Sequence, residues 1–96
     1  MTKVKSLYTL VVEFRKGIYV SQVKSNSVLE ALKTWTNELM PESIKYLDAS
    51  TVGFLKEELS KKGHEKPTRI NGMRNAWFAF LLTKKGGFYI NIIKTA

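Results

Sequence analysis

The feature that most constrains the fold is a pair of apolar runs in the last quarter of the sequence, separated by Lys84, Lys85 and two glycines. Two such runs around a short basic, glycine-containing segment predict a β-hairpin. A strand that is exposed on one side normally alternates apolar and polar residues, because successive side chains point to opposite faces. The first run, residues 76–82, does not alternate. We therefore expect both faces of this strand to be covered.

The length of the turn decides which side chains of this closing hairpin share a face. We expect a loop with an odd number of residues, 85–87, because it collects the largest apolar side chains on one side. The face predicted to meet the core then holds Phe78, Phe80, Leu82, Phe88, Ile90 and Ile92. The opposite face holds Trp77, Ala79, Leu81, Tyr89, Asn91 and Ile93. A piece of the same chain, another copy of the protein or a ligand with flat apolar groups could cover this second face.

A second hairpin is predicted near the start of the sequence. Residues 8–14 alternate and place four large apolar side chains on one face, and residues 18–23 return after a turn at 15–17. A three-residue loop with Gly17 in the left-handed conformation pairs Phe14 with Ile18 and Val12 with Val20. We expect this register because it gives the cleaner apolar face.

Two helices are predicted between the hairpins. The first begins at Ser27, which forms a capping-box pattern with Glu30, and it stops before Pro41. Its apolar stripe consists of Val28, Leu32, Trp35 and Leu39. The second helix is expected from about residue 50 to 62, with Gly63 as its C-terminal cap. Its inward residues are Val52, Leu55 and Leu59.

The resulting order β-β-α-α-β-β predicts an α+β fold in a single domain of 96 residues. The economical arrangement is a four-stranded antiparallel sheet with both helices packed on one face. A short additional strand near residues 68–70 is compatible with the loop before the closing hairpin, which also contains an Asn71-Gly72 turn signal. The pairing between the two hairpins does not follow from the sequence.

The residue types present argue against an enzyme. The chain has no cysteine, which excludes a disulfide framework, a thiolate zinc site and cysteine nucleophiles. The one histidine, His64, lies in a polar loop, and the carboxylates are scattered. We therefore expect no catalytic site, no metal and no cofactor. Because the apolar runs are too short to span a bilayer, we also expect a cytoplasmic protein with no membrane association.

Net charge is the unusual bulk property, at +8 with a sequence pI near 9.8. Between residue 66 and the end of the sequence there is no acidic side chain, whereas six are basic: Lys66, Arg69, Arg74, Lys84, Lys85 and Lys94. A positive field of this kind favours polyanions, nucleic acid above all. Solubility is an equally good reason for such an excess, since net charge suppresses association.

The segment "YTLVVEF", a turn, "GIYVSQV" and the helix "NSVLEALKTWTNEL" resemble the small N-terminal domain of HicB-type antitoxins. The resemblance covers residues 8–39. The proline-glycine segment usual before that helix is missing, as is a separate DNA-binding module after it. The resemblance implies a non-catalytic domain that binds a partner protein and oligomerises, and no functional residue is transferred.

Two hypotheses of different class follow. In the first, the protein is a non-enzymatic interaction module that forms a homodimer through the open sheet face of the closing hairpin. The residues expected in that contact are Trp77, Leu81, Tyr89 and Ile93. In the second, the protein binds nucleic acid with the basic stretch 61–74 and stacks bases on Trp77 and Tyr89. The basic residues expected in that contact are Lys61, Lys62, Lys66, Arg69 and Arg74.

Overall fold

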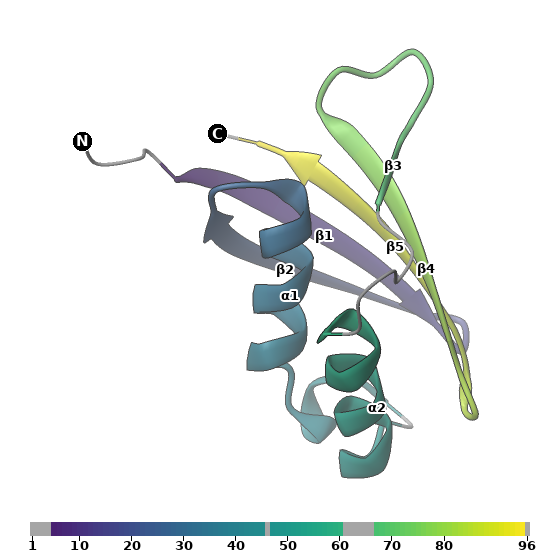
Figure 1. Ribbon diagram of the computed structural model, residues 1–96. Helices are drawn as coiled ribbons and strands as arrows, with labels where there is room; N and C mark the ends of the chain where they lie inside the picture. Colours follow the sequence, from purple (N-terminus) through teal and green to yellow (C-terminus); the bar gives the residue numbers. More distant parts are fainter. Residues whose placement is uncertain (1–4, 46, 61–66, 96) are drawn as a thin grey trace.

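The computed structural model describes residues 5–45, 47–60 and 67–95. In the order of the chain, two helices lie between two long hairpins. Both helices lie on one side of a twisted sheet (Figure 1). The elements in order are β1 (Ser6–Phe14), β2 (Gly17–Ser25), α1 (Val28–Glu38), the 3₁₀ turn η1 (Pro41–Ser43), α2 (Ala49–Ser60), β3 (Thr68–Arg69), β4 (Ala76–Thr83) and β5 (Gly86–Lys94). The predicted α+β class and antiparallel sheet are confirmed.

The sheet has five strands in the order β2-β1-β5-β4-β3, and every pairing is antiparallel. The prediction of four strands is short by one, because β3 adds two residues to the edge beside β4. The hairpins join through β1 and β5, with Leu10 opposite Ile92. The strand β5 therefore occupies the centre of the sheet.

Each helix begins just after a polar residue whose side chain accepts a hydrogen bond from a backbone N–H of the first turn. In α1 the Ser27 hydroxyl accepts a hydrogen bond from the backbone N–H of Glu30, at 3.2 Å, as the capping-box pattern predicts. In α2 the Asp48 carboxylate accepts from the backbone N–H of Thr51, at 2.7 Å. The sequence analysis had not identified this second cap. The expected cap of α2 at Gly63 lies outside the described residues.

One face of the sheet, here called the inner face, packs against both helices (Figure 1). Phe14 stacks on Phe88 with ring centroids 4.0 Å apart, and Trp35 of α1 meets Phe88 edge-on at 6.5 Å. Leu32 and Leu55, one from each helix, are completely buried. All five of these apolar side chains belong to one core cluster. The predicted inward stripes of both helices are therefore confirmed.

The predicted register of the first hairpin is wrong. Its turn has two residues, Arg15 and Lys16, and pairs Phe14 with Gly17 and Val12 with Tyr19. Both turn residues have positive φ, at 48° and 67°, so the left-handed conformation falls on them and not on the glycine. Tyr19 lies on the inner face beside Gly17, where an added Cβ would come within 2.6 Å of the phenol oxygen. A larger residue at this position would have to displace that ring.

The predicted register of the closing hairpin is also wrong. Its turn consists of Lys84 and Lys85, and Thr83 pairs with Gly86. The Thr83 hydroxyl stabilises this short turn, because it donates to the Gly86 carbonyl at 2.8 Å and accepts from the Lys85 N–H at 3.2 Å. Every side chain of β4 is consequently on the face opposite to the predicted one. The inner face of β4 carries Trp77, Ala79 and Leu81, and the outer face carries Phe78, Phe80 and Leu82.

Candidate interaction surface

The face of the sheet that the helices leave open, here called the outer face, is largely apolar across four neighbouring strands. The strand pairings set its side chains in rows. One row runs across the sheet through Val20, Val11, Asn91 and Phe78. The next row runs through Ile18, Glu13, Tyr89 and Phe80. Three of the four side chains in each row are apolar or aromatic, so the two rows form a continuous band.

Several members of this band are open to solvent. Ile18 is 69% exposed, Val20 is 64% exposed and Leu82, beside Phe80 on β4, is 69% exposed. Tyr89, on the central strand, is 47% exposed. Single exposed apolar residues are normal on a protein surface, whereas a contiguous apolar patch marks an interaction site. The outer face is such a patch.

Three aromatic rings form a cluster within the outer face. Phe80 meets Tyr89 edge-on with centroids 4.9 Å apart, and Phe78 lies 6.4 Å from the same tyrosine. The ring of Phe80 also lies over Gly87, where an added Cβ would come within 2.9 Å of it. These contacts hold the rings in place, so the cluster is a preorganised apolar surface.

The predicted self-association set is divided between the two faces. Tyr89 and Ile93 lie on the outer face, as expected. Trp77 and Leu81 lie on the inner face and pack against the core, so they cannot join them. The outer-face residues that sequence reasoning missed are Val11, Ile18, Val20, Phe78, Phe80 and Leu82. No local signal in the sequence identifies them, because two-residue turns with positive φ normally carry Asn or Gly, whereas the first turn consists of Arg15 and Lys16.

The predicted nucleic-acid residues are only partly described by the structure. Lys61, Lys62 and Lys66 lie outside the described residues. Arg69 on β3 is exposed, and its guanidinium lies 5.6 Å from the ring centroid of Trp77, a cation–π arrangement. Arg74 is exposed in the loop before β4. Trp77 and Tyr89 are on opposite faces of the sheet, so they cannot stack bases of one strand as the hypothesis required.

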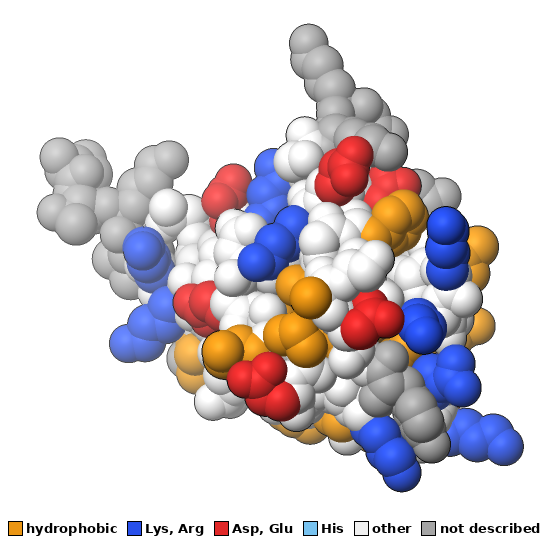
Figure 2. All heavy atoms as spheres, turned by 90° about the horizontal axis from the view of Figure 1, so that it is seen from below, with side chains coloured by type: hydrophobic (Ala, Val, Ile, Leu, Met, Phe, Trp, Pro, Cys, Tyr) orange, Lys and Arg blue, Asp and Glu red, His pale blue; other side chains and the backbone are white. Residues whose placement is uncertain are grey.

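Charge is distributed unequally between the two layers of the fold. The described sheet layer, residues 5–25 and 67–95, carries nine basic side chains and one acidic side chain, a net charge of +8. The helical layer, residues 26–45 and 47–60, carries three basic and six acidic side chains, a net charge of −3. Figure 2 shows several Lys and Arg side chains along the right-hand margin and others on the left and in the middle, with acidic side chains among them. The basic excess of the described residues therefore belongs to the sheet.

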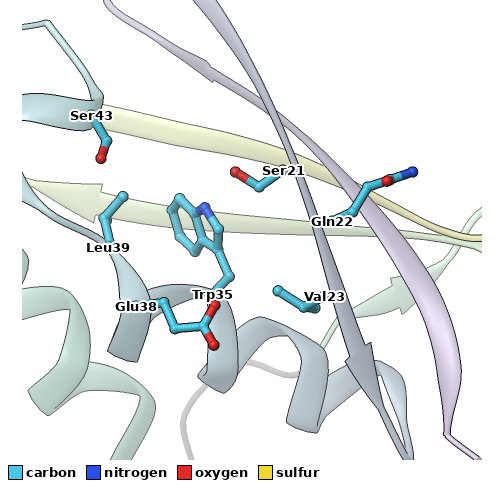
Figure 3. Close-up of a pocket in the computed structure, with 7 residues that line it drawn as sticks. All are labelled: Ser21, Gln22, Val23, Trp35, Glu38, Leu39 and Ser43. Carbon is cyan, nitrogen blue, oxygen red and sulfur yellow. The ribbon is translucent and has the colours of Figure 1, made fainter.

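A hollow of about 300 Å³ lies between β2 and the end of α1 (Figure 3). It is lined by Ser21, Gln22, Val23, Trp35, Glu38, Leu39 and Ser43. Glu38 is its one ionisable group, so it holds no acid–base pair. Within residues 5–45, 47–60 and 67–95 no three His, Asp or Glu side chains are grouped as metal ligands. The hollow therefore presents no chemistry comparable to the outer face.

Comparison of the chain with models of protein families, with curated proteins and with solved structures finds no match. The resemblance of residues 8–39 to HicB-type antitoxins is therefore neither supported nor contradicted. Of the helices in the described part of the chain, none has the length and apolar character needed to cross a membrane.

Proposed function

We propose that this protein is a non-enzymatic interaction module that forms a homodimer through the outer face of its sheet. The observation that supports the proposal is the continuous apolar band across β2, β1, β5 and β4, with Ile18, Val20 and Leu82 each more than 60% exposed. An apolar area of this kind is unfavourable in water and is stabilised when a second apolar surface covers it. The resemblance of residues 8–39 also implies a non-catalytic domain that oligomerises. The proposal places it in the cytoplasm, where a chain without cysteine needs no disulfides.

A second copy of the chain fits this face in size. Four strands about 4.8 Å apart and about nine residues long, at about 3.3 Å per residue, give a face of roughly 600 Å². Two such faces bury roughly 1,200 Å² in total, which is the lower end of the range for a specific interface. Sheets stack face to face about 10 Å apart, and a two-fold axis sets the same residues against each other. The dimer is then a sandwich with the helices on its outer sides.

Glu13 imposes a condition on this dimer. It is the one acidic side chain on the described strands, and it lies between Ile18 and Tyr89 in the apolar band. A carboxylate covered by an interface is stable only when a cation pairs with it. Lys24 points outward from β2 in the same sheet. The proposal therefore expects a basic side chain of the second copy, such as Lys24, opposite Glu13.

The decisive experiment measures the solution mass of the parent protein and of Phe78→Lys by light scattering or sedimentation. Phe78 lies on β4, two strands from Glu13, so a charge there disrupts face-to-face stacking without pairing with Glu13 and leaves the free edge of β2 unchanged. We expect a dimer for the parent and a folded monomer for the variant. Phe54→Lys is the matched control, because it adds the same charge at an exposed aromatic residue of α2. It should leave the dimer intact.

Two results would contradict the proposal. A parent protein that is monomeric at micromolar concentration would show that no second copy covers the outer face, and a different partner protein would become the better explanation. A Phe78→Lys variant that remains dimeric would show that the contact lies elsewhere, for example at the β2 edge.

A further inference from the structure

The two hairpin turns lie side by side at one end of the sheet, and all four of their central residues are basic. The antiparallel pairing of β1 with β5 brings the end of β1 next to the start of β5 (Figure 1). The Arg15 guanidinium donates a hydrogen bond to the Lys85 carbonyl at 3.0 Å, which links the two turns directly. We call this group, Arg15, Lys16, Lys84 and Lys85, the basic tip. All four residues are exposed.

The first turn holds its cations in an unfavourable backbone conformation. A two-residue turn with positive φ at both positions strongly favours Asn and Gly, because side chains with a Cβ are strained there. This turn has Arg15 and Lys16 instead, at φ 48° and 67°. This conformation is the one that a two-residue hairpin turn requires, and it holds both cations at the end of the sheet.

An ion pair joins the basic tip to the helical layer. Asp48 forms an ion pair with Lys85, with 3.7 Å between Nζ and Oδ2, and both side chains are about half exposed. Such exposed pairs are weak. The Asp48 carboxylate is also occupied by the N–H of Thr51. The two adjacent turns nevertheless place four exposed basic side chains at one end of the sheet.

We propose that the basic tip binds the phosphate backbone of nucleic acid without regard to base sequence. The centres of the two turns are two strand spacings apart, about 10 Å, and a nucleic-acid strand carries one charge for about every 3.4 Å of helix axis. Several phosphates can therefore meet the four cations at once. The tip contains no aromatic side chain, so it offers no surface on which bases could stack.

This site differs from the basic stretch at residues 61–74 and from the outer face. Arg69 pairs with Trp77 on β4. Trp77 is six residues from Thr83, where β4 ends at the turn, so Arg69 lies about 20 Å from the basic tip. The tip also lies at the end of the sheet and not on its face. Binding of nucleic acid there is consequently independent of the homodimer.

The test uses labelled 20-nucleotide single strands of two unrelated sequences and the corresponding duplexes, each titrated at several salt concentrations. The tip variant is Lys16→Gly with Lys84→Ser, and the control is Lys33→Ser with Lys56→Ser, which removes the same charge from the helices. Loss of two phosphate contacts should lower the salt slope by about 1.4 for the single strand and about 1.8 for the duplex. At 0.1 M salt the corresponding loss of affinity is about 25-fold for the single strand. The control should change affinity much less.

Thermal melting of each variant separates binding from folding. Glycine relaxes a left-handed position, so Lys16→Gly alone should melt at or above the temperature of the parent and yet bind more weakly. The Phe78→Lys variant should retain binding whatever its oligomeric state. The proposal is wrong if the parent does not bind either form at 50 mM salt, if tip and control variants lose affinity equally, or if binding depends on base sequence.

Discussion

The two faces of the sheet are similar in apolar content but opposite in environment. Along β5, Phe88, Ile90 and Ile92 are fully buried beneath the helices, whereas the neighbouring Tyr89 is 47% exposed on the other side. The apolar runs of β4 likewise contribute large side chains to both faces. The helices, rather than the composition of the strands, decide which face is the core. An apolar face without helices then requires another covering, which is the basis of the proposed dimer.

The largest expected difference between the two faces is a difference in stability between variants of two adjacent residues of β4. Leu81→Lys places a charge at a partly buried position that packs against the core, and should destabilise the protein by about 3 kcal/mol. Leu82→Lys places the same charge on the outer face and should change the free energy of unfolding by about 0.5 kcal/mol or less. Chemical denaturation at a dilution where the parent is monomeric measures both. Equal losses would show that the register of the closing hairpin is incorrect.

A second test compares a helix residue on the inner face with a strand residue on the outer face. Leu32 has no exposed surface, so Leu32→Ala should cost about 2–5 kcal/mol through the cavity that it leaves. Val20→Ala in the monomer should cost about 1 kcal/mol or less, because its side chain is mostly in water and only strand propensity is lost. Urea unfolding curves provide both numbers. A Leu32→Ala protein as stable as the parent would refute the packing of α1 on the sheet.

The smallest effect concerns Asp48, which connects the helical layer to the turn of the closing hairpin. Its hydrogen bonds from Thr51 lower the pKa of the carboxyl below its usual range, and the nearby Lys85 lowers it further. A lowered pKa in the folded state stabilises the protein above the pKa of the unfolded chain, and this contribution is lost as pH falls through the folded pKa. Melting curves of the parent and of Asp48→Ala should therefore differ at pH 7 and converge below about pH 4. A constant difference would argue against an ionic role for Asp48.

The parts of the fold that were predicted correctly depend on local signals. The start of α1 follows from Ser27 and Glu30, which lie three residues apart, and its end follows from Pro41. The turn at Asn71-Gly72 also follows from its own residues, since Gly72 has φ 84° and the Met73 N–H bonds to the Ile70 carbonyl. Each of these signals acts over a few residues, so tertiary packing did not override it.

The registers were mispredicted because packing, not local sequence, decides them. In the closing hairpin both choices of face were apolar, and Ala79, the smallest inward residue of β4, is buried there at 7% exposure. A large side chain at each inward position would overfill the space below the helices. In the first hairpin the non-glycine residues Arg15 and Lys16 took the left-handed conformation. Half of the predicted contact set, Trp77 and Leu81, was misplaced for this reason.

The central position of β5 has a consequence for the order of folding. Its contacts with β1 join residues as far apart as Tyr8 and Lys94, so they close the longest loop in the sheet. Among the described elements, β5 is synthesised last. Until it is available, the first hairpin and both helices lack the strand that fills their core. Phe14, for example, has no Phe88 to stack on until then. We therefore expect slow, concerted formation of the sheet once β5 is available, rather than stepwise folding hairpin by hairpin.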